Sequence, residues 1–208
     1  MKIGIIDFGA GNLFSLSSAL KRLGQDYLIS SQEKELENCT ALILPGVGAF
    51  KDAITALATS GLADFIHKQA RQGKEILGIC LGMQLLFEES FEYGRSKGLS
   101  LLLGRIVKIP SGVKIPHMGW NSLEISDKWT AGKEFAKLYV YFVHSYYAET
   151  EKEYVLASVK HGIEIPAIVG SNNITGMQFH PEKSGAAGEA LLRAWLEKSK
   201  KESGENGF

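Results

Sequence analysis

The first ninety residues alternate short apolar runs with longer amphipathic stretches, and this alternation limits the fold more than any other feature of the sequence. The apolar runs have the length of strands and the amphipathic stretches the length of helices. Strands are expected at 3–7, 27–30, 41–44 and 75–79, and helices at about 13–23 and across 50–72. Strands that alternate with helices in this way form a parallel sheet covered by helices. We therefore expect an α/β fold.

The second half of the chain has a different rhythm, with strand-like segments at closer spacing. They fall at 138–143, 154–159, 167–169 and 174–179, and they are expected to add antiparallel strands to the same sheet, which makes it mixed but mostly parallel. A closing amphipathic helix is expected from Gly188 to about Ser199. No linker or change of composition divides the chain. We expect one domain over residues 1–200 and a frayed polar tail over 201–208.

The composition excludes several classes of protein. Basic and acidic residues balance at 23 each, and no segment gathers enough Lys and Arg to follow the phosphate backbone of a nucleic acid. No apolar segment predicts a secretion signal or a membrane span. The two cysteines cannot form a disulfide framework, and the spaced Cys and His pairs of a zinc site are missing. We expect a cytoplasmic protein without a metal or another cofactor.

Cys80 lies between Gly78 and Gly82, where the apolar run 75–79 gives way to helical spacing through Gln84 and Glu88. Glycines two residues to either side let a strand and a helix approach closely around a sharp turn, which is the arrangement of a nucleophile elbow. At the start of a helix, unpaired backbone N–H groups favour thiolate over thiol. The alternative is a cysteine that packs in the core as a small hydrophobe, which is how we interpret Cys39.

One further segment has competing interpretations. The segment 7–12, Asp-Phe-Gly-Ala-Gly-Asn, follows the first expected strand and resembles the start of a dinucleotide fingerprint. However, Phe14 stands where that fingerprint has its third glycine, so a tight turn before the first helix is the simpler explanation.

A thiolate nucleophile needs a base, and the base needs a group that orients it. His180 is followed by Pro181 and Glu182, and extended backbone around the proline would project His180 and Glu182 to the same side. Glu182 could then fix the imidazole tautomer and stabilise the imidazolium. The other four histidines lack an adjacent carboxylate. Of these, His67 and His161 are expected at the surface, and His117 and His144 stand in less ordinary contexts.

An oxyanion formed during acyl transfer requires N–H donors. The N–H of Leu81 directly follows the nucleophile. A second donor could come from the glycine-rich loop after the strand 41–44, where open α/β sheets place their sites, with Gly46 and Gly48 allowing the loop to change conformation. A plain turn between a strand and a helix is the alternative.

These residues resemble those of the class I, triad-type glutamine amidotransferases. The segments 45–48, 78–84 and 180–182 occur in the order and approximate spacing of that family, and the match runs from Lys2 to the last helix. The resemblance implies a three-layer, flavodoxin-like fold. A narrower resemblance, to the glutaminase subunits of imidazole glycerol phosphate synthases, rests on segments 45–50 (PGVGAF), 116–121 (PHMGWN), 141–146 (YFVHSY) and 180–184 (HPEKS).

The resemblance implies that the chain hydrolyses glutamine to glutamate and ammonia. A (β/α)8-barrel cyclase subunit would receive the ammonia, forming a heterodimer that makes imidazole glycerol phosphate and AICAR in histidine biosynthesis. By matching positions, the catalytic residues are Cys80, His180 and Glu182, and the oxyanion donors are Val47 and Leu81. The glutamine would be bound by Gly48, Gln84, Glu92, Ser145 and Tyr146.

Family behaviour adds that the glutaminase is nearly silent until the partner carries its nucleotide. A peptide rotation at Val47, between two glycines, would then complete the oxyanion hole. Asn12, Trp120 and Lys183 are the candidates for the partner face, with a core position as the alternative for Trp120.

Three other functions compete with this interpretation. A cysteine peptidase or an α/β-hydrolase could use similar groups, but in the hydrolase order an acid precedes the histidine, whereas here Glu182 follows His180. The glutaminase subunit of another synthase is the nearest alternative. A non-catalytic regulatory homologue is the third, although no triad position is missing.

Overall fold

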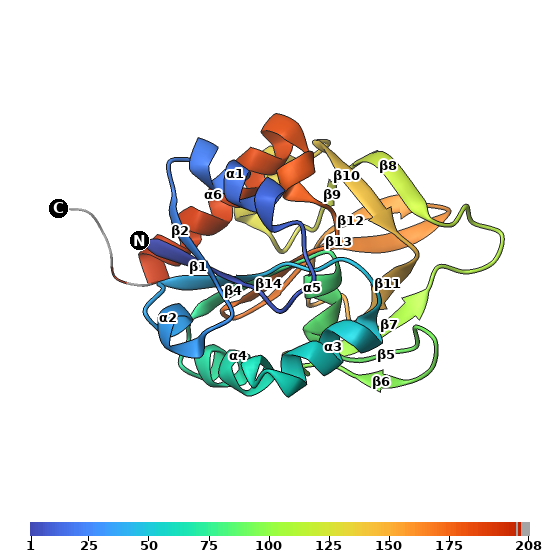
Figure 1. Cartoon of the computed structure of the whole chain (residues 1–208). Coiled ribbons are helices and arrows are strands. Elements are labelled where there is room, and N and C mark those ends of the chain that lie inside the picture. Colours follow the sequence, from blue (N-terminus) through green and yellow to red (C-terminus); the bar gives the residue numbers. More distant parts are fainter. Residues whose placement is uncertain (203, 205–208) are drawn as a thin grey trace.

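The computed structural model describes residues 1–202 and 204, and an eight-stranded mixed sheet forms its centre (Figure 1). The strand order is β2-β1-β3-β4-β14-β13-β12-β9. The first five strands in this order run parallel, and the last three pair antiparallel. The bounds are β1 (Lys2–Ile6), β2 (Asp26–Ser30), β3 (Ala41–Leu44), β4 (Glu75–Ile79), β9 (Glu124–Ile125), β12 (Val155–His161), β13 (Ile163–Ser171) and β14 (Ile174–Met177).

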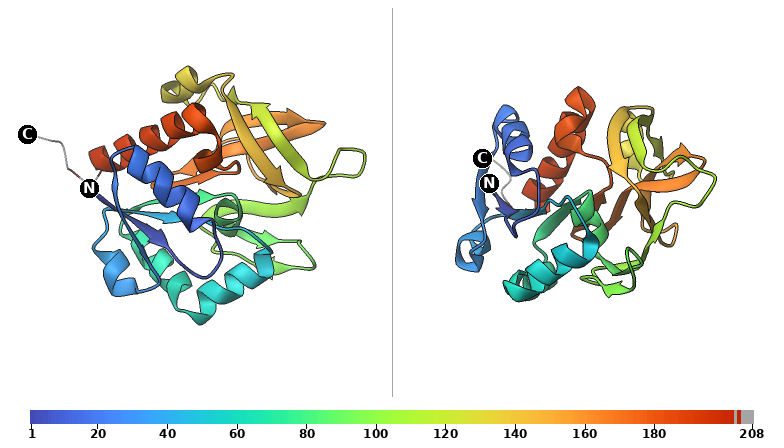
Figure 2. Two further views of the ribbon diagram at one scale, coloured as in Figure 1. Left: turned by 45° about the horizontal axis from the view of Figure 1, so that its top comes forward. Right: turned by 45° about the vertical axis from the view of Figure 1, so that its right-hand side comes forward.

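Helices cover both faces of this sheet, which confirms the three-layer α/β prediction. On one face lie α1 (Leu13–Arg22) and α6 (Gly185–Glu202), and on the other α2 (Glu33–Glu37), α3 (Phe50–Thr59) and α4 (Leu62–Arg71) (Figures 1 and 2). Each face has its own cluster of buried apolar side chains. The central strands β3 and β4 are buried at every position, because both of their faces lie under helices.

The expectation that the second half adds strands to the main sheet is confirmed for the segments that form β12, β13 and β14, but the segment 138–143 lies outside it, because the remaining strands form two smaller sheets. One sheet pairs β8 (His117–Ser122) with β10 (Tyr139–His144). The other has the order β11-β7-β5-β6, with β11 (Tyr146–Glu149), β7 (Leu102–Lys108), β5 (Phe87–Ser90) and β6 (Ser96–Lys97). Buried and less buried positions alternate along β10, and a strand with one exposed face cannot lie between two helical layers.

Several helix boundaries differ from the sequence prediction. The helix after Cys80, α5 (Leu81–Leu85), ends early, and Glu88 belongs to β5. The closing helix is longer than predicted at both ends, so 201–202 of the expected frayed tail are helical; the rest of that tail, except Gly204, lies outside the described residues. Across the part of the chain that the structure describes, no helix is long and apolar enough to cross a membrane.

Parallel strands place their carboxyl ends at one edge of the sheet, and that edge collects the predicted site. Four neighbouring strands, β1, β3, β4 and β14, are followed there by Asn12, by the loop 45–48, by Cys80 and by His180. Residues that lie up to 168 positions apart in sequence therefore meet through topology alone.

The turn at Cys80 depends on two close backbone approaches. A Cβ atom on Gly82 would lie 1.8 Å from the Leu44 carbonyl oxygen, and one on Gly78 would lie 2.7 Å from the backbone of Met83. Real Cβ atoms do not approach backbone atoms this closely, so β3, β4 and α5 can pack together only if both positions are glycine.

Replacing Gly82 with alanine should therefore be far more damaging than replacing a glycine that only has a left-handed backbone. Gly73 has φ +81° and no atom within 4 Å of an added Cβ, which makes Gly73→Ala the matched control. We expect Gly73→Ala to lower the free energy of unfolding by about 1–2 kcal/mol and Gly82→Ala by at least about 3 kcal/mol. Urea unfolding measures both, and equal losses would contradict this packing.

Candidate active site

Cys80 adopts the strained backbone of a nucleophile elbow. Its φ of 54° and ψ of −110° are rare for a residue with a side chain, at a cost of about 1–3 kcal/mol. Hydrogen bonds on both sides hold this conformation: Cys80 N–H donates to the Met177 carbonyl at 2.7 Å, and the Cys80 carbonyl accepts from Gln84 N–H at 3.1 Å. Cys80 is only 7% exposed, so it shares the burial expected of a cysteine in the core. Cys39 packs among apolar side chains, as predicted.

His180 and Glu182 lie in contact, as the sequence predicted. The His180 Nδ1 and Glu182 Oε1 atoms lie 2.8 Å apart, and both side chains are 3% exposed. The backbone before the proline is extended at His180, as predicted, but Pro181–Lys183 forms a short 3₁₀ turn, η2, so the alternation of an extended segment does not bring the two side chains together. The turn still brings the two side chains together, and the other influence on the ring comes from Cys80, which helps to raise its pKa.

The surroundings of His180 favour its charged form. Burial opposes that charge, but the hydrogen bonds and negative charges of Cys80 and Glu182 outweigh burial and raise the pKa of His180 to about 9. The imidazole is therefore protonated at neutral pH. A protonated imidazole beside a cysteine is the arrangement found around activated cysteine nucleophiles.

Hydrogen bonds made by its own backbone fix the position of His180. Its N–H donates to the Tyr141 carbonyl on β10 at 2.9 Å, and its carbonyl accepts from the Ser184 hydroxyl at 2.7 Å. Ser184 Oγ in turn accepts from Tyr141 N–H at 3.0 Å. The small β8–β10 sheet thus attaches directly to the turn that holds His180.

The loop 45–48 lies against the elbow, as the predicted oxyanion role requires. A Cβ on Gly46 would be 3.0 Å from the backbone nitrogen of Gly82, and Gly48 has φ +104°. Val47 is 43% exposed. A cavity of about 10 Å³, large enough for a single small molecule such as water, lies between this loop and the pair His180 and Glu182.

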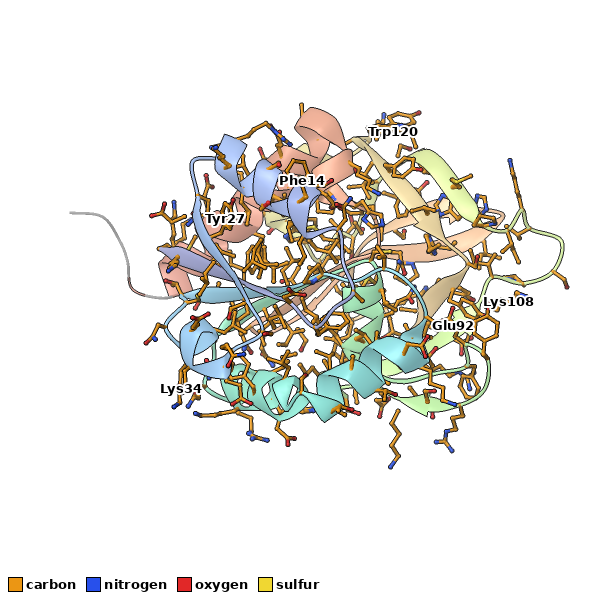
Figure 3. The ribbon with its side chains drawn as sticks, viewed as in Figure 1. Phe14, Tyr27, Lys34, Glu92, Lys108 and Trp120 are labelled. Carbon is orange, nitrogen blue, oxygen red and sulfur yellow. The ribbon has the colours of Figure 1, made fainter. Side chains whose placement is uncertain are left out.

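The predicted glutamine-binding residues gather beside this loop and the elbow. Gln84, on α5, donates from Nε2 to the Tyr146 carbonyl at 3.0 Å. Glu92 lies at the N-terminus of α3, where its Oε2 accepts from Phe50 N–H at 2.6 Å (Figure 3). Gly48 stands two residues before Phe50, and Ser145 joins β10 to β11 directly before Tyr146.

The three partner-face candidates lie at or near the surface. Trp120 is 55% exposed at the outer edge of β8, which excludes the core alternative (Figure 3). Lys183 is exposed on η2. Asn12 is half-buried and has a structural task as well, because its Oδ1 accepts from Ser15 N–H at the start of α1.

Sequence reasoning did not single out Gln178, whose fully buried amide lies 3.9 Å from Cys80 Sγ. One signal could have found it. Gln178 stands two residues before His180, and alternate residues of an extended segment project to the same side.

His117 and His144 form a buried pair that the sequence noted without a partner. His144 Nδ1 lies 2.8 Å from the Tyr146 carbonyl oxygen, and its Nε2 lies 3.0 Å from His117 Nδ1. A carbonyl only accepts, so Nδ1 carries the proton on both rings. His161, predicted at the surface, is partly buried and stacks on His117 with ring centroids 4.1 Å apart.

Burial keeps both rings of this pair neutral. It lowers the pKa of His117 to about 4, helped by the charge of His161. It lowers the pKa of His144 to about 3, against the hydrogen bond to the Tyr146 carbonyl and with the charges of the other nearby histidines. The hydrogen bond between the rings exists only in this neutral state, because protonation would set two N–H groups against each other.

Comparison with known proteins agrees with this geometry. The family model described as glutamine amidotransferase class-I matches residues 4–198. The chain is 50% identical over 197 residues to "Imidazole glycerol phosphate synthase subunit HisH" of Bacillus velezensis, which covers 91% of this chain and 93% of that protein. It is 52% identical over 193 residues to the protein of that name from Caldanaerobacter subterraneus, covering 92% and 95%.

Solved structures show the same fold at lower identity. A structure titled "Crystal structure of glutamine amidotransferase" superposes with a TM-score of 0.77 at 24% identity, covering 95% of this chain and 98% of that one. The structure of PurLQS from Thermotoga maritima superposes with a TM-score of 0.73 at 21% identity, covering 95% and 98%.

The neutral histidine pair makes the protein sensitive to mild acid. Both histidines have lower pKa values when folded than when unfolded, so below pH 6.5 the unfolded chain binds more protons and stability falls with pH. Between pH 6.5 and 5 we expect the pair to lower the free energy of unfolding by about 3 kcal/mol. The raised pKa of His180 does not add to this dependence of stability on pH, because the stabilisation that it provides is already complete below pH 6.5.

Urea unfolding at several pH values measures this slope. In His117→Asn, the slope of the free energy of unfolding against pH should be smaller by the equivalent of about one bound proton. His67→Gln, a change on α4 far from the pair, should leave this slope unchanged. An unchanged slope in His117→Asn would contradict the neutral pair.

Proposed function

This chain belongs to the class I glutamine amidotransferases, and we propose that Cys80, His180 and Glu182 form the triad with which it hydrolyses glutamine to glutamate and ammonia. Relatives of about 50% identity over most of its length are subunits of imidazole glycerol phosphate synthase. The chain is accordingly the glutaminase subunit of that enzyme in histidine biosynthesis. The observation that carries the triad is the buried His180, whose Nδ1 lies 2.8 Å from Glu182 Oε1 and whose pKa is raised by both Cys80 and Glu182.

The first step is attack of the Cys80 thiolate on the side-chain amide carbon of glutamine. The amide oxygen becomes an oxyanion, which the N–H groups of Leu81 and Val47 stabilise at about 3 kcal/mol each. His180 then donates its Nε2 proton to the leaving nitrogen. The carbon–nitrogen bond breaks, ammonia departs, and a thioester joins glutamate to Cys80.

The second step hydrolyses the thioester. His180, now neutral, takes a proton from water as the water attacks the thioester carbon, and Cys80 leaves as a thiolate. Glutamate is released and His180 is again protonated. Glu182 orients the ring and stabilises its charge at both stages.

Glutamine is held by groups around the elbow. Gln84, Glu92, Gly48 and the backbone of Ser145 and Tyr146 bind its α-amino and carboxylate ends. Glu92 supports this role because only one of its carboxylate oxygens is engaged with Phe50 N–H, which leaves the other for an ammonium group.

The partner is a (β/α)8-barrel cyclase subunit that covers the face around Asn12, Trp120 and Lys183. Exposed apolar side chains support this interface: Phe14 is 81% exposed and Trp120 55% (Figure 3), and Met118, two residues before Trp120 on β8, is 60% exposed. The small cavity beside His180 and Val47 has room for one ammonia on the same side. Docking there rotates the Val47 peptide and completes the oxyanion hole.

Removing triad members should affect turnover to different degrees. In the complete complex, with glutamine and the cyclase nucleotide, Cys80→Ala should abolish glutamate release. Glu182→Gln should reduce it by about 10²–10⁴-fold, because the ring loses its orienting charge. Glutamate release that persists in Cys80→Ala would overturn the triad.

The partner face makes a separate prediction. Trp120→Ala should weaken binding of the cyclase subunit by about 10-fold or more, since exposed tryptophans are frequent anchors of interfaces. Leu103→Ala removes a side chain that is 53% exposed on β7, in another sheet, and should leave binding unchanged. Titration calorimetry measures both affinities, and equal values would contradict this placement.

Activation by the partner tests whether rotation of the Val47 peptide controls the activity. The isolated chain should hydrolyse glutamine slowly, and addition of the cyclase subunit with its nucleotide should raise the rate by at least about 100-fold, as one recovered oxyanion donor implies. Equal turnover by the chain and by the complex would rule out control by rotation of the Val47 peptide.

A further inference from the structure

Gln178 stands next to Cys80 because their strands pair in register. Met177 on β14 lies opposite Ile79 on β4, so the next residues along the two parallel strands, Gln178 and Cys80, are also neighbours. The backbone N–H of Gln178 donates to the Ala167 carbonyl at 2.9 Å, which fixes the start of its side chain.

Both ends of the Gln178 amide have a partner, although the side chain is fully buried. Its Nε2 lies 3.9 Å from Cys80 Sγ, and its Oε1 accepts from Gln84 Nε2 at 3.0 Å. None of the roles assigned so far to the triad, the oxyanion donors or the glutamine-binding groups includes this residue.

The network around Gln178 determines which end of its amide faces the sulfur. Gln84 Nε2 also donates to the Tyr146 carbonyl at 3.0 Å, and a carbonyl can only accept. The nitrogen of Gln84 must therefore point toward both acceptors, so Gln178 presents its oxygen to Gln84 and its NH₂ group to Cys80.

The same carbonyl is held from its other side. His144 Nδ1 donates to the Tyr146 oxygen at 2.8 Å, and His117 completes the chain of hydrogen bonds to β8. Tyr146 O thus has two donors in fixed positions. These donors hold the Tyr146 carbonyl in place. The carbonyl therefore keeps Gln84 oriented, and Gln84 in turn keeps Gln178 oriented.

We propose that Gln178 is a positioning residue for the nucleophile, which donates an amide N–H to the Cys80 sulfur and favours its thiolate in a fixed direction. The inference rests on the proposed triad. A hydrogen bond to a charged sulfur is stronger than one to a neutral thiol, so it stabilises the thiolate selectively.

An amide is suited to this task because it does not titrate. His180 gives up its proton during the reaction and regains it, so its attraction for the sulfur changes from step to step. Gln178 keeps the same two N–H groups throughout. It holds the sulfur when the thioester releases it as a thiolate, and it forms no covalent bond itself.

The test replaces Gln178 with methionine, which keeps the length and approximate volume but removes donor and acceptor. The rate of alkylation of Cys80 by iodoacetamide is followed against pH in the full chain, with the modified site identified by peptide mass spectrometry. We expect the midpoint of the alkylation profile to rise by about one pH unit, a tenfold loss of thiolate at low pH.

Gln69→Met is the matched control. Gln69 is also a buried glutamine, 1% exposed on α4, but it does not contact the site. A merely structural loss of a buried amide would affect both variants alike, whereas only Gln178→Met should shift the alkylation midpoint. In the complex, Gln178→Met should lower kcat about tenfold and change KM by less than about twofold.

An alkylation midpoint equal to that of the wild type would overturn the inference. Failure of the proposed function would give a different result, namely a wild-type complex that releases no glutamate from glutamine. The alkylation profile does not depend on glutamine or on the partner, so the two failures are distinguishable.

The wild-type chain provides a second measurement if Gln178→Met does not fold. With ¹⁵N-labelled glutamine side chains, one buried NH₂ pair should shift in NMR spectra with the same midpoint as Cys80 alkylation, and that titration should vanish in Cys80→Ala. Absence of such a titrating NH₂ pair would equally overturn the inference.

Discussion

The close approach of α5 to the end of β3 is the constraint on which the site depends. Gly82 lies so near the Leu44 carbonyl that no side chain fits there, and Gly78 meets Met83 in the same way. This contact forces the turn at Cys80 into a left-handed backbone, and the hydrogen bond to Met177 holds it. The strain at Cys80 is therefore maintained by the packing of three strands, and the thiol is directed toward His180 and Gln178 without a flexible loop.

The histidines around this elbow show how the surroundings decide the charge of one residue type. His180 is as buried as His117, yet the negative groups on both sides of its ring raise its pKa, whereas burial without a carboxylate lowers the pKa of His117 and His144. The charged ring can pass a proton to a leaving group. The neutral rings give directional hydrogen bonds that fix the Tyr146 carbonyl and, through Gln84, the Gln178 amide.

The sequence predicted the parts of the fold that local periodicity encodes. The strands β3 and β4 and the helices α3 and α4 were placed well, because fully buried runs and amphipathic stretches alternate there. Cys80, His180 and Glu182 were found because glycine spacing and a carboxylate beside a histidine are local signals. The pairing of β10 with β8 was not predicted, since strand partners are chosen by long-range packing. Gln178 was missed for a similar reason: its partner is on a neighbouring strand, 98 residues away.

The most direct test of the central claim, that the elbow makes Cys80 the nucleophile, is to label the nucleophile covalently with a reactive analogue of the substrate. The complete complex would be incubated with a diazoketone analogue of glutamine, and the modified residue located by peptide mass spectrometry. We expect one label per chain, on Cys80 and not on the buried Cys39, with glutamine protecting against it. Labelling of Cys39, or labelling of Cys80 that glutamine does not slow, would contradict the account.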